Sequence, residues 1–262
     1  MILTRREVEF MNAEEKTKNM ENETEKEHQN PVLKYVKDKD FPAAGAVATD
    51  SGAIRKSFWL MVLAALSGSI NVFYDLPAET VLCIIAATFF TGLRICLCPD
   101  DAKLLAPVYA VLEGLSLGFV SVECGKTYPG IVLHTMIITL GIAILTSSIF
   151  SRGWIRVSHT FKSVTFIATA GIAFLYLTDI ALITGFGIQV PLLHETGWKS
   201  IAASIFIICV ASMNLLLDYE EIYALSKKNY PEDYEWYFAF ALVVTLFWIY
   251  IEAMNLLRRW LR

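Results

Sequence analysis

Residues 237–257, YFAFALVVTLFWIYIEAMNLL, contain a single charged side chain, Glu252, and show no polar face. A helix of about 20 apolar residues crosses the roughly 30 Å hydrocarbon core of a bilayer, and this segment has 21 residues. A surface helix of a soluble protein would instead show a polar side. The segment therefore predicts a membrane-spanning helix that carries an acid inside it.

The composition of the whole chain agrees with an integral membrane protein. Of its 262 residues, 55% are hydrophobic and 18% are charged, against roughly 25% charged in a typical soluble domain. Seven runs have the length of a membrane span: 57–74, 77–98, 103–122, 130–150, 163–187, 199–218 and 235–257. They predict an all-α fold, a polytopic seven-transmembrane-helix bundle over residues 55–260, with the lipid bilayer as its main partner.

Charge distribution separates a tail from this bundle. Residues 1–40 hold 18 of the 48 charged side chains, so residues 1–50 are predicted to form a disordered tail. Nine Lys or Arg residues lie at the ends and loops on the side of this tail, and two lie on the other side, which predicts a cytoplasmic N-terminus. The carboxyl-terminal sequence LLRRWLR disagrees with this rule, because seven spans place its three arginines outside.

Several functions are not expected from these residues. No basic block indicates a nucleic-acid partner, and the five cysteines lack metal-ligand spacing, so neither a metal site nor a cofactor is expected. The one combination suited to a serine protease is Ser67 or Ser69 with His134, and no zinc-protease motif is present. We expect no enzymatic activity.

Ionisable residues within the spans are the candidate functional residues, because such groups persist in membranes mainly where they face a protein interior or an aqueous path. They are Glu113, His134, Asp179, Asp218 and Glu252, with Arg94 as the candidate cation. At a rise of about 1.5 Å per residue, Glu113 and Asp218 lie at similar depths and Glu252 lies further out. The alternative is that these groups only satisfy one another or backbone carbonyls.

Gly114 and Gly118 are four residues apart in the third run, at the spacing that allows two helix backbones to approach closely. This pattern predicts a helix-packing site. It also predicts a central position for this helix in the bundle.

Four stretches together resemble the Bax inhibitor-1-like membrane protein family, in its bacterial branch. They are APVYAVLEGLSLGFVS (106–121), YPGIVLHTMIITLGIAIL (128–145), LLLDYEEI (215–222) and EWYFAFALVVTLFWIYIEAMNLLRRW (235–260). The resemblance implies a bacterial plasma membrane, seven helices around a central last helix, and a pH-dependent leak of Ca²⁺. It also implies a gate made of two acids on the last two helices, for which Asp218 matches the first and Glu252 is the counterpart of the second.

The spacing of Asp218 and Glu252 is wider than the resemblance implies, so two arrangements stay open. The acids form a direct pair, or they form two clusters, with Glu252 near Asp179 or His134 and Asp218 near Glu113 or Arg94. Either arrangement predicts a cation leak gated by protons, with Ca²⁺ as the transported ion, because carboxylate oxygens are suitable ligands for Ca²⁺. The alternative function is a non-conducting regulator that binds another membrane protein through the Gly114 and Gly118 face.

Overall fold

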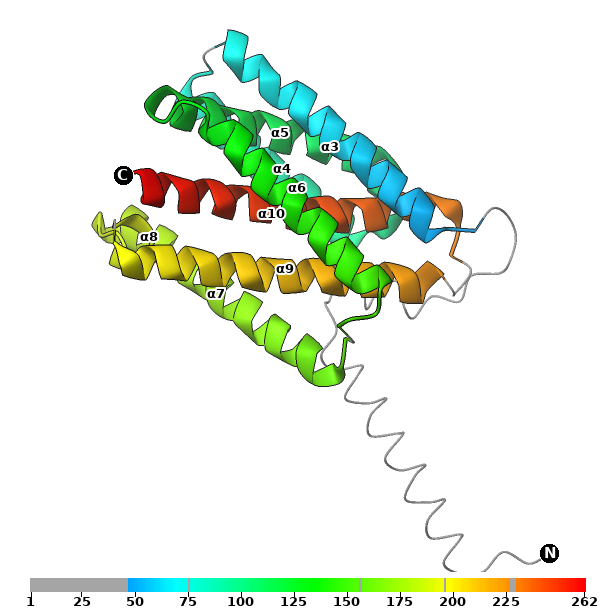
Figure 1. Cartoon of the computed structure of the whole chain (residues 1–262). Helices are drawn as coiled ribbons and strands as arrows, with labels where there is room; N and C mark the ends of the chain where they lie inside the picture. The colour runs from blue at the N-terminus through cyan, green and yellow to red at the C-terminus, as the bar shows by residue number, and fades with distance from the viewer. Residues whose placement is uncertain (1–46, 75, 156, 196, 227–229) are drawn as a thin grey trace, which may run out of the picture.

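The computed structural model describes residues 47–74, 76–155, 157–195, 197–226 and 230–262. In this part of the chain, seven helices are long and apolar enough to cross a membrane (Figure 1). They are α3 (Asp50–Phe73), α4 (Ala78–Leu97), α5 (Ala102–Thr127), α6 (Ile131–Ser151), α7 (His159–Phe186), α9 (Trp198–Ser226) and α10 (Glu235–Leu261). No strand occurs among the described residues, so the predicted all-α seven-helix fold is confirmed. The predicted tail, up to residue 46, lies outside them.

Most helices extend beyond the apolar runs that predicted them. The α9 helix continues eight residues past Asp218, because backbone hydrogen bonds can continue where side chains leave the hydrocarbon core. Three short helices in the connections were not predicted: η1 (Pro99–Asp101), α8 (Pro191–His194) and η2 (Glu232–Tyr234). The helices run alternately up and down. We call the face with the start of α10 the Glu235 end and the opposite face the Arg259 end.

The outer surface of the bundle is apolar. Large side chains such as Leu104, Phe174 and Phe186 are more than two-thirds exposed, on helices of membrane-spanning length. Burying such side chains in hydrocarbon rather than water is favourable by about 25 cal/mol per Å². This surface contacts the lipid bilayer, as predicted.

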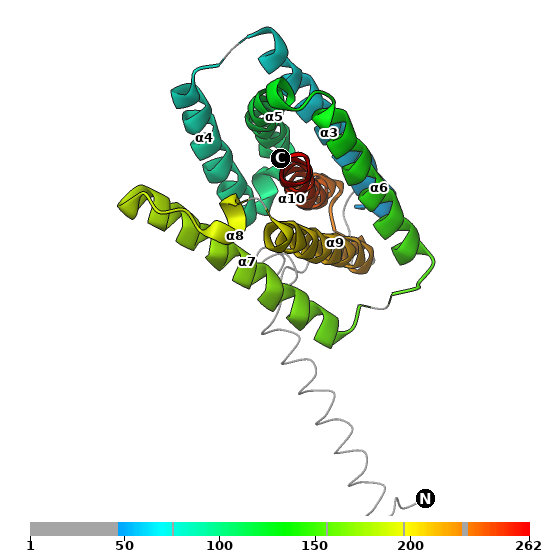
Figure 2. The ribbon, with the colours of Figure 1, turned by 60° about the vertical axis from the view of Figure 1, so that its left-hand side comes forward.

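The α10 helix forms the centre of the bundle, with α3, α5, α6 and α9 around it (Figure 2). Of its most apolar stretch 56% is buried, against 39% for α5 and 11% for α7. Its side chains Tyr237, Phe238 and Ile249 are among the largest fully buried ones. The central helix is therefore α10, as the family resemblance implied, rather than the third span.

Close helix approach occurs between α5 and α3. A Cβ atom on Gly114 would overlap the carbonyl oxygen of Ala64, and one on Gly118 would overlap the backbone of Gly68. The two helix backbones are thus in contact where the spacing predicted a packing site. The α3 helix of the same chain packs against Gly114 and Gly118, so their spacing is explained by packing within the bundle, and a partner protein bound at this face stays a prediction.

Candidate functional site

Polar side chains of α10 bond to neighbouring helices at five levels along its length. From the Glu235 end upward these side chains are Glu235, Thr245, Tyr250, Glu252 and Arg259, and they contact α3, α9, α5, α7 and the α8–α9 region respectively. A helix in the interior of a bundle can carry such groups because protein, rather than lipid, surrounds them. The candidate site is this column of contacts.

Asp218 of α9 contacts the middle of α10. Its Oδ2 accepts a hydrogen bond of 2.5 Å from the hydroxyl of Thr245. The same hydroxyl lies 3.4 Å from the carbonyl oxygen of Ala241, one turn earlier in α10. Thr245 thus has a second acceptor within its own helix and can release Asp218 without leaving its hydroxyl unbonded. Among the described residues, no Lys or Arg forms an ion pair with Asp218.

Glu113 of α5 lies at a similar depth. It is 11 residues from the start of α5, or about 16 Å from the Glu235 end, and Thr245 is 10 residues from the start of α10, or about 15 Å. Glu113 is half-buried, and no hydrogen bond or ion pair to it is found in the described part of the chain. The helices that carry Glu113 and Asp218 lie on different sides of α10 (Figure 2).

Glu252 is only 1% exposed. Its Oε1 accepts a hydrogen bond from the hydroxyl of Tyr176 on α7, and its Oε2 is buried without a hydrogen-bond partner in the described structure. Seven residues separate Glu252 from Thr245, a rise of about 10 Å along α10. Asp218 and Glu252 therefore occupy two positions along the column rather than one shared hydrogen bond.

Arg259 ties α10 to the outer ends of its neighbours. Although it lies near the end of the chain, it is 8% exposed. Its Nη1 donates to the carbonyl oxygen of Ser200 at 3.1 Å and to the hydroxyl of Ser204, and its Nη2 donates to the carbonyl oxygen of Leu193 in α8 at 2.6 Å. This guanidinium is a buried cation that bonds to polar groups of the neighbouring helices.

Asp179 of α7 holds α8 from the other side. Its Oδ1 accepts from the backbone N–H of Val190 at 2.9 Å, and its Oδ2 lies 2.7 Å from Nε2 of His194. The α7 helix ends at Gly187, whose φ of 67° is left-handed, and this turn directs the chain back toward Asp179. Asp179 is 6% exposed and the His194 side chain is 34% exposed, so the pair connects a buried acid with the Arg259 end.

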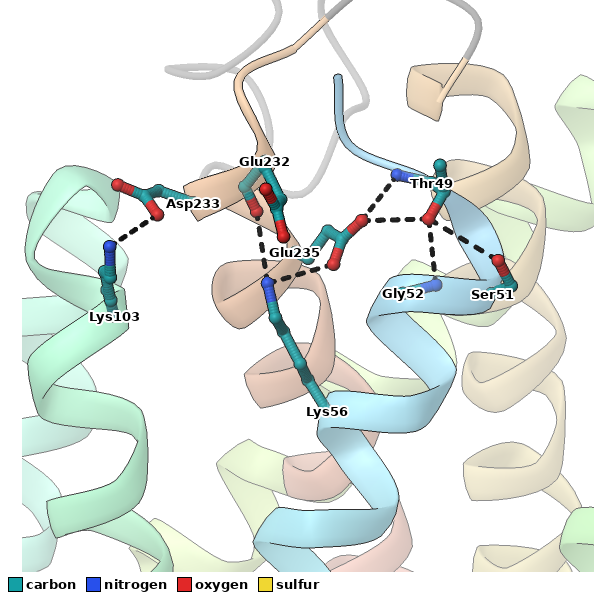
Figure 3. Close-up of polar contacts among 8 residues, drawn as sticks. All are labelled: Thr49, Ser51, Gly52, Lys56, Lys103, Glu232, Asp233 and Glu235. Carbon is teal, nitrogen blue, oxygen red and sulfur yellow. Dashed lines mark hydrogen bonds and ion pairs between the residues drawn. The ribbon is translucent and has the colours of Figure 1, made fainter. Parts of the chain in front are cut away.

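At the opposite end, Glu235 joins α10 to the start of α3 (Figure 3). Its Oε1 accepts from the backbone N–H and the hydroxyl of Thr49 at 2.8 and 2.9 Å, and its Oε2 lies 2.9 Å from Nζ of Lys56. The carboxylate occupies the space where Gly52 has no side chain. Thr49 also caps α3, because its side chain accepts from the N–H of Gly52.

The profile of the family described as Bax inhibitor 1 like matches residues 9–261, nearly the whole chain. The chain belongs to the Bax inhibitor 1 like family. The resemblance seen in the sequence is thereby confirmed. Searches of curated proteins and of solved structures found no significant match.

Two predicted residues of this Bax inhibitor 1 like protein lie outside its interior. His134 is exposed and its Nδ1 contacts the carbonyl oxygen of Gly130, one turn earlier in its own helix, at 2.8 Å. Arg94 lies near the end of α4, where its 59% exposed side chain pairs with Asp101 at 2.7 Å. Neither contributes to the column, because a long or terminal side chain at a helix end can reach water.

The partners proposed for the two acids also differ from those observed. Glu252 bonds to Tyr176 rather than to Asp179 or His134, and Asp218 bonds to Thr245 rather than to Glu113 or Arg94. The arrangement with two positions is thus the observed one, with partners that the sequence did not indicate. A usable signal existed for Arg259, which follows Glu252 by seven residues and so shares its face of α10.

Proposed function

We propose that this protein is a pH-sensitive cation leak, with Ca²⁺ as the transported ion and with Asp218 and Glu252 as the groups that respond to protons. The observation that carries the proposal is that Glu113 and Asp218 lie at similar depth beside the central helix without an ion pair in the described structure. Carboxylates in an otherwise apolar path favour cations over anions. Their oxygens are also the ligands that Ca²⁺ prefers.

The contact between Asp218 and Thr245 offers a way to couple an ion to the helices. An ionised Asp218 accepts the Thr245 hydroxyl, and this bond joins α9 to α10. A cation that approaches Asp218 competes for the same oxygen, and Thr245 can then donate to Ala241. Protonation removes the negative charge that attracts the cation. The contact between α9 and α10 therefore depends on both the ion and the proton.

Glu252 adds a second proton-dependent contact, between α7 and α10. An ionised Glu252 accepts from Tyr176, whereas a protonated one can itself donate through its second oxygen, which has no partner in the described structure. In this proposal the Glu235 end faces the cytoplasm of a bacterial plasma membrane, in keeping with the Lys and Arg excess on that side. The function requires no catalysis.

The test is Ca²⁺ entry into liposomes that contain the full chain and a Ca²⁺-sensitive dye, measured across the neutral pH range. Wild-type protein is expected to pass Ca²⁺ at a rate that depends on pH. Asp218→Asn is expected to lower the flux, and Asp218→Asn with Glu252→Gln is expected to abolish its pH dependence. The matched control is Asp101→Asn, which removes an exposed carboxylate at the Glu235 end.

The ion-leak proposal fails if wild-type liposomes admit no more Ca²⁺ than protein-free liposomes. The assignment of the two acids fails if the double variant keeps both the flux and the pH response of the wild type. Unchanged helicity and an unchanged elution volume in detergent show that each variant remains folded.

A further inference from the structure

A groove of about 450 Å³ runs along the bundle between α3, α5 and α6. Its floor is formed by Leu246, Phe247 and Tyr250 of the central helix α10. Residues on its rim, including Ala65 and Leu140, are exposed. The groove is therefore open on the surface that the protein presents to lipid.

The groove has the depth of one leaflet of a bilayer. Its lining runs along α3 from Met61 to Val72 and along α5 from Gly114 to Gly125, in each case a rise of about 16 Å. Half of the hydrocarbon core is about 15 Å. Val72 is one residue from the end of α3 at the Arg259 end, so the groove extends from that membrane face to about the middle of the membrane.

The chemistry of the lining selects an apolar occupant. No charged side chain of the described part of the chain lines the groove. The lining hydroxyl groups already have partners within the protein: Ser69 donates to the carbonyl oxygen of Leu66 at 2.7 Å, Thr139 donates to that of Thr135 at 2.9 Å, and Ser121 and Tyr250 bond to each other at 2.7 Å. Water or an ion in this groove would find neither a charged side chain nor a free hydroxyl donor among the described lining residues.

We propose that the groove holds one acyl chain of a phospholipid from the leaflet at the Arg259 end. The bilayer supplies this ligand at the open rim, the groove is as deep as the leaflet, and its lining has no unmet hydrogen-bond requirement. The acyl chain would pack on Phe247 and Tyr250, which lie between Thr245 and Glu252 along α10. The bound lipid thus supports the stretch of the central helix that joins the two acid positions. This inference does not depend on whether the protein conducts ions.

The experiment uses the full-length protein in two preparations of phosphatidylcholine vesicles. Each preparation contains a small fraction of a different photoactivatable phosphatidylcholine. One carries a diazirine at the end of an acyl chain, and the other carries it close to the ester group. Cross-linked residues are identified by mass spectrometry of peptides. The chain-end probe is expected to label groove residues near Met61 and Gly114 several-fold more than the exposed face of α4, and the ester-side probe is expected to label residues near Val72 and Gly125.

A variant that fills the groove tests occupancy directly. Ala65→Phe places a ring in the groove and is expected to reduce groove labelling several-fold. The control Ala87→Phe adds the same ring to an exposed position of α4 outside the groove, and it should leave groove labelling unchanged. Equal labelling of the groove and of the α4 face in wild-type protein would overturn the proposal. The absence of groove labelling would also overturn it, and this result is expected if a second copy of the protein or another helix covers the groove. These wild-type outcomes decide the matter even if Ala65→Phe fails to fold.

Discussion

Replacing Lys56 by Met should destabilise the protein strongly, because Lys56 neutralises a buried carboxylate. The Lys56 and Glu235 side chains are 12% and 4% exposed, and their charged atoms are 2.9 Å apart. Lys56 also lies 3.4 Å from the carbonyl oxygen of Glu232 and 5.3 Å from the centre of the Trp236 ring. Methionine retains the apolar stem and removes the charge together with the N–H donors of the ammonium group.

The magnitude follows from the burial of the partner. Removing one member of a buried ion pair costs about 3–5 kcal/mol, because the remaining charge stays in a medium of low dielectric constant. Glu235 keeps its two hydrogen bonds from Thr49, so we expect the lower end of this range, about 3 kcal/mol. Adding Glu235→Gln should restore most of this loss, because the amide oxygen can still accept from Thr49 and no buried charge remains.

The pair Lys103 and Asp233 provides a matched control (Figure 3). This pair joins η2, the short helix before α10, to α5. Its atoms are likewise 2.9 Å apart, but the side chains are 62% and 61% exposed, so Lys103→Met should leave stability unchanged because water screens such a pair. The measurement is the free energy of unfolding in mixed detergent micelles titrated with sodium dodecyl sulfate and followed by helicity. Equal losses for Lys56→Met and Lys103→Met would refute the reasoning.

Two further predictions concern other parts of the bundle. Gly114→Leu should prevent close packing of α3 on α5 and abolish folding in detergent. The control Gly141→Leu, at a glycine with open space around it, should be tolerated. Gel filtration distinguishes folded from unfolded protein, and a folded Gly114→Leu variant would contradict the packing. Arg259→Met should release α8 and increase the rate of hydrogen exchange of the amides around Leu193. The control is Arg258→Met, because Arg258 is adjacent and exposed. An unchanged exchange rate in Arg259→Met would show that the guanidinium does not hold α8.

The sequence predicted those features that depend on neighbouring residues in the chain. Seven apolar runs of sufficient length predicted seven helices, since a span's length is set by the thickness of the bilayer. Gly114 and Gly118 predicted close approach, because removal of the Cβ atom permits it on any helix. Neither pattern identifies which helix packs against a given helix. That α3 packs against these glycines is a property of the assembled bundle.

The partners of the acids could not be predicted because they come from distant parts of the chain. Tyr176 is 76 residues from Glu252, and Leu193 is 66 residues from Arg259. Hydropathy fixes the depth of a residue in the membrane, but it leaves open which helices lie side by side. Arg259 belongs to the carboxyl-terminal arginines that disagree with the orientation rule. In the structure its side chain is buried and bonded to α8 and α9.

The polar content of α10 explains why this helix lies at the centre. A charged side chain such as Glu252, facing lipid within the hydrocarbon core, would cost about 2.5–3.5 kcal/mol on insertion scales. The α7 helix, the least buried of the described spans, accordingly keeps its acid Asp179 against α8 rather than lipid. Placing α10 in the interior gives the side chains of Thr245, Glu252 and Arg259 partners on neighbouring helices. Because those partners belong to different helices, the hydrogen bonds of Thr245 and Glu252 bind α10 to both α9 and α7. In the proposed function, a change of charge at Asp218 would therefore act on the contact of α10 with α9, and a change at Glu252 would act on its contact with α7.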